Sequence, residues 1–157
     1  MRDLRELNIN EGGKPVARAA PTDQQIHEFE ARFDVRLPES YKSLLKFSNG
    51  GHPELDAFQP NGAAEAAFWG INRFYHLDNG RTDHEGIWRS TEEWRSSTGQ
   101  RIVPVANDGG GNQLVLNYDL SPPSVHMLIH DEDFRLLQVA NTFDEFLNLL
   151  SRDPDMI

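Results

Sequence analysis

The segment from Leu37 to Gly51, LPESYKSLLKFSNGG, most constrains how this chain folds, because it carries the signals for both ends of a short helix. Pro38 suits the first helical position, where its missing N–H costs nothing. Tyr41, Leu44 and Leu45 follow at i, i+3 and i+4, which puts one apolar stripe on the helix. The Asn-Gly-Gly at the end tolerates the left-handed backbone of a helix terminus. The segment therefore predicts an amphipathic helix that covers an apolar surface.

Further helices are predicted on both sides of a run of strands. Three capping boxes mark helix starts: Thr22-x-x-Gln25, Ser90-x-x-Glu93 and Thr142-x-x-Glu145. The middle one should end near Gly99. Four short apolar segments bounded by turn residues predict strands: Ile102–Val105, Gln113–Tyr118, Val125–Ile129 and Phe134–Val139. The aromatic segment Ala67–Leu77 is consistent with another strand, and residues 52–66 with a loop.

The short connections decide how these strands pair. A parallel pair needs a crossover of a dozen or more residues, so strands this close in sequence must be antiparallel. We therefore predict an α+β domain, an antiparallel β-sheet flanked by two N-terminal helices, a short middle helix and a C-terminal helix. Residues 1–20 lack sustained periodicity and are expected to form an irregular arm, with one domain over residues 21–157.

The composition is that of a soluble globular protein with an acidic surface. Of the 157 residues, 38% are hydrophobic, and the net charge is −10. No apolar run approaches the roughly 20 residues of a membrane span, and no secretory signal is evident, so we expect a cytoplasmic protein without membrane contact. An acidic surface repels phosphates, which disfavours direct nucleic-acid binding. It either steers a basic partner or simply keeps the protein soluble.

Three blocks of the chain resemble the SUKH superfamily, which takes in bacterial immunity proteins and a yeast cell-wall-synthesis regulator. They are LPESYKSLLKFSNGG with the helix before it, IVPVANDGGGNQLVLNY at 102–118, and VHMLIHDEDFRLLQVANTFDEFLNLL at 125–150. Their order and spacing carry the resemblance. The residues that match the family pattern are assigned to the fold: Leu37, Pro38, Tyr41, Gly50, Trp69, Gly111 and Asn112.

Asp108-Gly-Gly-Gly-Asn112 has the glycines of a phosphate-binding loop, but its context favours a turn. A phosphate loop leads into a helix and carries Gly-Lys-Ser/Thr. Here the strand-like QLVLNY follows. A tight turn between two strands is the favoured interpretation, and the resemblance implies the same turn.

Two segments carry the residue types of metal ligands, and neither predicts a metal site. His126 and His130 have the spacing of a helical zinc pair, but on a strand four residues span about 13 Å. Residues 76–85, HLDNGRTDHE, are rich in oxygen and imidazole ligands but lack the EF-hand order. We expect no metal and no other cofactor, and we expect this second segment to be an exposed loop suited to binding.

The leading hypothesis is a non-catalytic immunity protein that binds and neutralises a cognate bacterial toxin domain, a role implied by the resemblance. Many such toxins are nucleases, whose basic clefts an acidic protein can shield. The expected toxin contacts are acidic side chains in predicted loops: Asp78, Asp83, Glu85, Asp108, Asp131, Glu132 and Asp133. Asp108 has an alternative role, because it is also placed to serve its own turn. The last three should form a hairpin tip that is either a solvated loop or a partner contact.

Two alternatives stay open at this point. A regulatory or scaffold module, resembling the yeast branch, would bind a self-protein instead of a toxin. A hydrolase using the acidic and histidine cluster has the least support, because the chain has no Gly-x-Ser-x-Gly, no cysteine and no HExxH motif. We expect the free protein to be a monomer.

Overall fold

A computed structural model describes residues 1–60, 68–77 and 83–152 of the chain. Its elements are the 3-10 helix η1 (Leu4–Leu7), α1 (Asp23–Phe33), α2 (Glu39–Phe47), β1 (Ala57–Phe58), β2 (Trp69–Gly70), β3 (Arg73–Phe74), α3 (Ile87–Thr98), β4 (Ile102–Asn107), β5 (Gln113–Asn117), β6 (Ser124–Ile129), β7 (Arg135–Ala140) and α4 (Phe143–Leu149).

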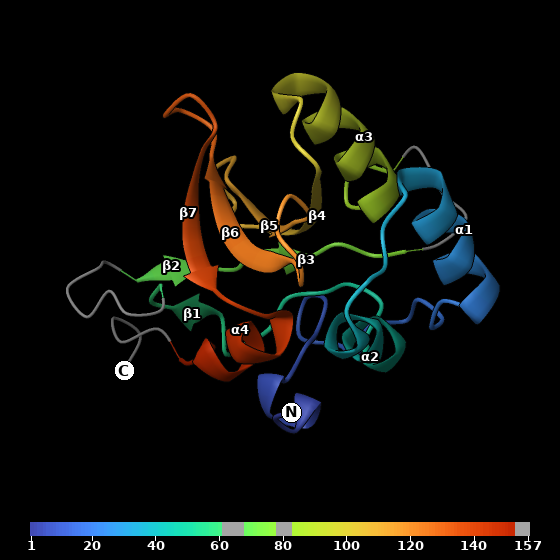
Figure 1. The fold of residues 1–157 in the computed structure, drawn as a ribbon. Helices are drawn as coiled ribbons and strands as arrows, with labels where there is room; N and C mark the ends of the chain where they lie inside the picture. Colours follow the sequence, from blue (N-terminus) through green and yellow to red (C-terminus); the bar gives the residue numbers. More distant parts are fainter. Residues whose placement is uncertain (61–67, 78–82, 153–157) are drawn as a thin grey trace.

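The main sheet has five antiparallel strands in the order β3-β4-β5-β6-β7, and β1 pairs with β2 in a small second sheet. Every strand after β3 is therefore the neighbour of the one that precedes it in the chain. Figure 1 shows α4 next to α2 beneath the curved strands β6 and β7, with α3 against β4 on the other side of the molecule. The predicted α+β architecture is confirmed.

Strand β5 is buried on both faces and separates two apolar clusters. Leu114 and Leu116 point into the main core, while Val115 packs with Ile102 and Leu128 in a smaller cluster. Alternate residues of a strand face opposite sides of the sheet, so both clusters must be covered by other elements. Helices α2 and α4 cover the first cluster, and α3 together with the β6–β7 hairpin covers the second.

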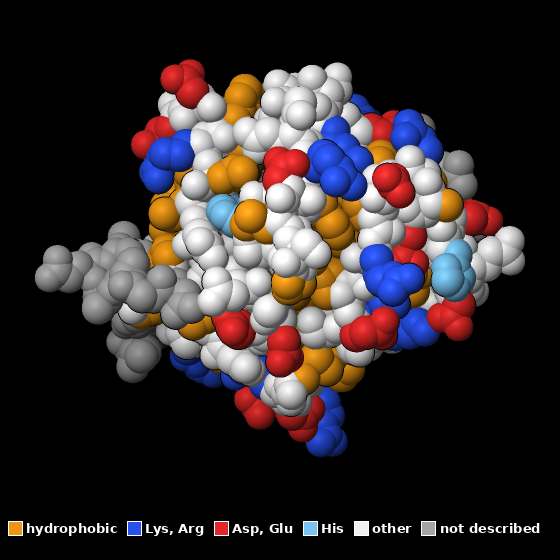
Figure 2. All heavy atoms as spheres, viewed as in Figure 1, with side chains coloured by type: hydrophobic (Ala, Val, Ile, Leu, Met, Phe, Trp, Pro, Cys, Tyr) orange, Lys and Arg blue, Asp and Glu red, His pale blue; other side chains and the backbone are white. Residues whose placement is uncertain are grey.

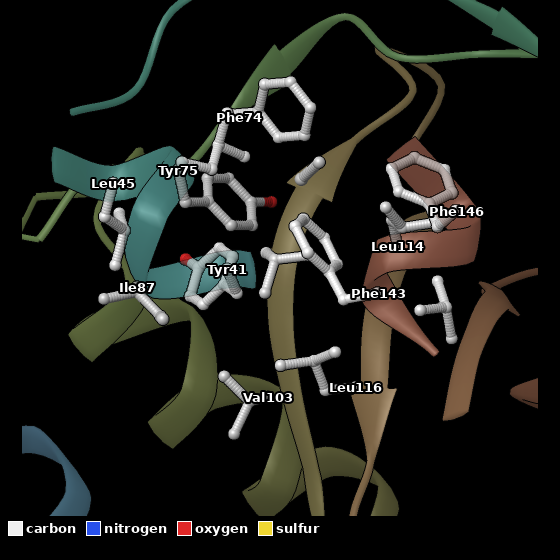
Figure 3. Close-up of a cluster of buried hydrophobic side chains, with 14 of the residues drawn as sticks. Tyr41, Leu45, Phe74, Tyr75, Ile87, Val103, Leu114, Leu116, Phe143 and Phe146 are labelled. Carbon is white, nitrogen blue, oxygen red and sulfur yellow. The ribbon is translucent and has the colours of Figure 1, made fainter. Parts of the chain in front are cut away.

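Aromatic side chains join the helices in the main core. Tyr41 of α2 meets Phe143 of α4 edge to face, with ring centroids 5.1 Å apart. Phe146 meets Phe58 of β1 in the same way at 5.4 Å. Figure 3 shows Tyr41 and Phe143 close together among aliphatic side chains of the strands, which include Leu116. Such pairs contribute about 0.5–1.5 kcal/mol beyond the area they bury.

The N-terminal segment packs on the rest of the domain. Leu4 and Leu7 are buried in the main core. The Arg2 guanidinium donates to the carbonyl oxygens of Leu147 and Leu150, at 2.7 and 2.8 Å. These carbonyls belong to the last turn of α4, where a cation is favourable.

Two helix starts differ from the sequence prediction. Helix α3 begins at Ile87 after Gly86, so Ser90 lies inside the helix and caps nothing. The earlier start buries Trp88, whose ring lies 5.5 Å from that of Phe29. Pro38 is the N-cap of α2, one position before the first helical residue, because its ψ of 145° is extended.

The expected strand Ala67–Leu77 is divided. Within its described part, Trp69–Gly70 pairs with β1 and Arg73–Phe74 pairs with β4, so the two halves belong to different sheets. The loop expected over residues 52–66 likewise contains β1. A single aromatic-rich run does not reveal which neighbour each half will find, since pairing is a tertiary property.

The burial of Phe146 in the main core predicts a large loss of stability for Phe146→Ala. Phe146 is fully buried, and removing such a ring costs about 3–5 kcal/mol of unfolding free energy. Urea denaturation followed by fluorescence measures this loss. Phe47→Ala on α2 is the control, because Phe47 is 47% exposed and its loss should change stability by less than about 1 kcal/mol. Equal losses in the two variants would contradict this description of the core.

Candidate functional site

The β4–β5 turn is built around the Asp108 carboxylate. Its Oδ1 accepts hydrogen bonds from the backbone N–H of Gly110 at 2.8 Å and of Asn112 at 3.0 Å, and its Oδ2 accepts from the Asn112 side-chain amide at 2.9 Å. Gly111 has a φ of +98°, and a Cβ there would lie 2.9 Å from the His130 ring. The predicted strand-to-strand turn is confirmed, and Asp108 has a structural role in it.

This turn is tied to the loop between β6 and β7. The Asn112 Oδ1 accepts the backbone N–H of His130 at 3.0 Å, and it also lies 2.8 Å from the His130 Nδ1. Asp108 and the acidic residues that follow His130 are therefore brought to the same end of the sheet.

The hairpin tip, residues 130–134, presents three exposed acidic side chains: Asp131, Glu132 and Asp133. Figure 1 shows it at the upper left, and Figure 2 shows acidic side chains in that position. Glu132 pairs with Arg135 at 3.2 Å. Within the described part of the chain, Asp131 and Asp133 have no ion-pair partner.

An aromatic pair lies directly beside these acids. Phe134 follows Asp133 in the left-handed backbone region, with φ values of 58° and 55°, and its ring meets that of Trp94 on α3 edge to face at 6.1 Å. Both side chains are only partly buried. A bulky residue with positive φ is uncommon and indicates that the surrounding structure fixes this loop.

Asp83 and Glu85 lie elsewhere, beside the edge strand β3 and on the far side of the sheet order from β7. The Asp83 Oδ2 is 2.9 Å from His76 Nε2, and Glu85 pairs with Arg73 at 2.7 Å. The hydrogen bond from the backbone N–H of Glu85 lowers the pKa of the Asp83 carboxyl below its usual value, and the hydrogen bond with His76 lowers it further. Asp78 lies outside the described residues. Among the described residues of the predicted acidic set, the hairpin-tip acids therefore lie at the β7 edge of the sheet, and Asp83 and Glu85 lie at the β3 edge.

His126 on β6 and His130 directly after it are held in different surroundings and, within the described residues, do not form a shared metal site. His126 is 7% exposed, and burial lowers its pKa. His130 is exposed and engaged with Asn112. In the described ranges, residues 1–60, 68–77 and 83–152, no three His, Asp or Glu side chains are grouped so as to hold a metal ion.

A groove of about 770 Å³ lies at the other end of strands β5 and β6. Three segments form its walls: residues 34–40, which are the α1–α2 link and the start of α2; residues 118 and 120–123 between β5 and β6; and residues 142–144 at the start of α4, with Arg101 beside them. Figure 2 shows apolar side chains in the hollow in the middle of this face, with charged groups around them. The volume is typical of ligand-binding clefts.

Hydrogen bonds fix the walls of this groove. The Tyr118 hydroxyl donates to the Arg36 carbonyl at 2.8 Å, and burial raises the pKa of Tyr118. Arg101 donates to the Asp34 carbonyl at 3.2 Å. The two walls are therefore connected although they lie about 80 residues apart in the sequence.

This groove was not predicted from the sequence. Two of its residues, Leu37 and Pro38, had been assigned to the fold alone. The available signal was Leu120, an exposed apolar residue followed by Ser-Pro-Pro in a segment with no strand or helix pattern. No helix or strand pattern within this loop requires an apolar side chain at that position. The sequence does not show, however, which other segments face the loop.

Comparison with known proteins identifies the family. The chain matches the SMI1/KNR4 family (SUKH-1) over residues 20–149, most of its length, and it belongs to that family. All seven residues that the sequence pattern assigned to the fold fall within the match. No curated protein matches the chain. Within the described residues, no helix combines the length and hydropathy needed to cross a bilayer.

The geometry predicts that Asp108 and Asp131 differ in their effect on stability. Asp108→Ala removes the acceptors of three hydrogen bonds in the turn and should lower the unfolding free energy by about 1–3 kcal/mol. Asp131→Ala, at the exposed tip, should change it by less than about 0.5 kcal/mol. Thermal and urea denaturation of both variants measure the difference. Loss of stability in Asp131→Ala but not in Asp108→Ala would reverse the assignment.

Proposed function

We propose that this protein is an immunity protein, which binds a cognate bacterial toxin domain and blocks it without catalysing a reaction. Membership of the SUKH-1 family is the observation that carries the proposal, since proteins of this family are typically toxin immunity proteins. The α+β domain with protruding, charged loops suits recognition of another protein.

The charge distribution supports a basic toxin, such as a nuclease. The net charge of −10 produces an electric field that attracts a positively charged partner. Salt limits the range of this attraction to about one Debye length, roughly 8 Å at physiological ionic strength. A nuclease binds the phosphates of its nucleic-acid substrate with positively charged side chains. The exposed acids Asp131 and Asp133, which have no ion-pair partner within the described residues, are available to those cations. Asp83, Glu85 and the undescribed Asp78 are proposed as secondary contacts.

The aromatic pair beside the hairpin tip supports a role for this end of the sheet in binding. Charge attraction mainly accelerates association, whereas partly buried aromatic side chains supply the contacts that hold a complex together. Trp94 and Phe134 lie next to the acidic residues and are only partly covered. The hairpin tip thus combines both kinds of group.

The proposal predicts a toxin gene immediately upstream of the gene for this protein, and the decisive experiment uses the toxin domain encoded there. Cells that express that domain should survive when this protein is co-expressed, and the two purified proteins should form a stable complex. Survival without a complex, or turnover of a nucleotide, peptide or sugar substrate by the purified protein, would overturn the proposal. A complex with a host protein and no protection would favour a regulatory role.

Charge reversal at the hairpin tip tests its part in recognition. The variant Asp131→Lys, Glu132→Lys, Asp133→Asn should bind the toxin with a slower association rate and a weaker dependence of that rate on salt, because attraction is lost. Asn is used at position 133 because it tolerates the left-handed backbone. Stopped-flow fluorescence measures both quantities.

The matched control for this variant is Glu28→Lys, Glu54→Lys, Glu92→Gln, which changes the net charge equally at exposed sites away from the tip. It should retain more of the wild-type association rate. If both variants slow association to the same extent, net charge alone matters and the hairpin tip is not a contact.

A further inference from the structure

We propose that the groove between the α1–α2 link, the β5–β6 loop and the start of α4 binds a partner segment in which a Lys or Arg stands next to a leucine-sized apolar side chain. The inference rests on the proposed function, under which the segment belongs to the toxin domain. It adds a second contact surface, at the end of the sheet opposite the hairpin tip.

The apolar part of the groove calls for an apolar side chain. Leu120 lines this part of the groove and is 48% exposed. The stability of the fold does not require an apolar side chain at such an exposed loop position. Pro122 and Pro123 continue the same wall, and Val35 and Pro38 stand in the facing one. Rigid, partly exposed apolar groups in a concavity form the kind of site that anchors a protruding side chain.

The charged part calls for a cation. The Asp144 carboxylate lines the groove, and its Oδ1 is buried without a hydrogen-bond donor among the described residues. Asp144 is half-buried, and the charge of a carboxylate with one oxygen covered and unpaired is stabilised by an ammonium or guanidinium group placed beside it in the groove. The charged residues that line the groove are three acidic ones, Asp34, Glu39 and Asp144, and two basic ones, Arg36 and Arg101, so the lining keeps an excess of negative charge. The net charge of −10 also disfavours an acidic segment.

One partner can reach both surfaces. Strand β6 has six residues and spans about 20 Å between the hairpin tip and the β5–β6 loop. A protein interface of ordinary size covers about 800 Å² on each partner, a patch wider than this distance. Figure 2, viewed as in Figure 1, shows the hairpin tip and the groove on the same face of the molecule.

The first test measures toxin binding by calorimetry. Leu120→Ala and Asp144→Asn should each weaken binding about tenfold, the range found for anchor residues. Two controls remove a similar group elsewhere: Phe47→Ala, with nearly the same exposed fraction as Leu120, and Glu54→Gln. Each control should change the dissociation constant less than about threefold. Melting temperatures equal to wild type confirm that the variants are folded.

The second test does not depend on the toxin. In ¹⁵N NMR spectra, millimolar N-acetyl-Leu-Arg-amide should shift the amide signals of Leu120, Thr142 and Asp144, and N-acetyl-Leu-Glu-amide should not. If the toxin binds wild type but Leu120→Ala and Asp144→Asn bind it equally well, and the two peptides behave alike, the groove proposal is wrong while the immunity role stands. If the toxin does not bind wild type, the immunity role fails, and the peptides alone decide the chemistry of the groove.

Discussion

The double-sided burial of strand β5 is the constraint on which the remaining structure depends. All five of its residues are buried, so apolar cover is needed on both faces of the sheet. Helices α2 and α4 supply it on one face, and α3 with the β6–β7 hairpin supplies it on the other. Strand β5 is also the middle strand of the sheet, and the connections at its two ends lie at opposite ends of the sheet. The β4–β5 turn borders the hairpin tip, and the β5–β6 loop forms a wall of the groove.

Local signals were enough for most of the fold. The capping box at Thr22 forms as predicted, with both reciprocal hydrogen bonds present. The four strands from β4 to β7 occur within one or two residues of their predicted bounds, because short turns leave antiparallel pairing as the only option. The predicted start of α3 at Ser90 was wrong. Burial of Ile87 and Trp88 stabilises an earlier helix start more than a cap at Ser90 would, and no local pattern reports that burial.

The candidate site was only partly predictable for the same reason. Loop acids can be read from a sequence, and the exposed tip at Asp131 to Asp133 is where the pattern placed it. Asp108 is engaged locally by its own turn, as the sequence had indicated. Glu85 is paired with Arg73, a residue of a different segment, and such a tertiary contact leaves no local signal. Apart from the isolated signal of Leu120, the groove could not be predicted from the sequence, because segments around residues 36, 120 and 143 meet only in the folded chain.

The two proposed surfaces would affect different rates of binding, the hairpin tip the association rate and the groove the dissociation rate. Exposed charges at the hairpin tip act at long range, so their effect falls mainly on the association rate and is screened by salt. The groove acts only at contact, where apolar burial and a desolvated ion pair lower the dissociation rate. Association and dissociation can then change independently: a toxin with an altered charge pattern would bind more slowly yet stay bound if its anchor segment were kept. An immunity protein built this way discriminates between toxins of equal charge through the groove, and through the hairpin tip responds quickly to any basic one.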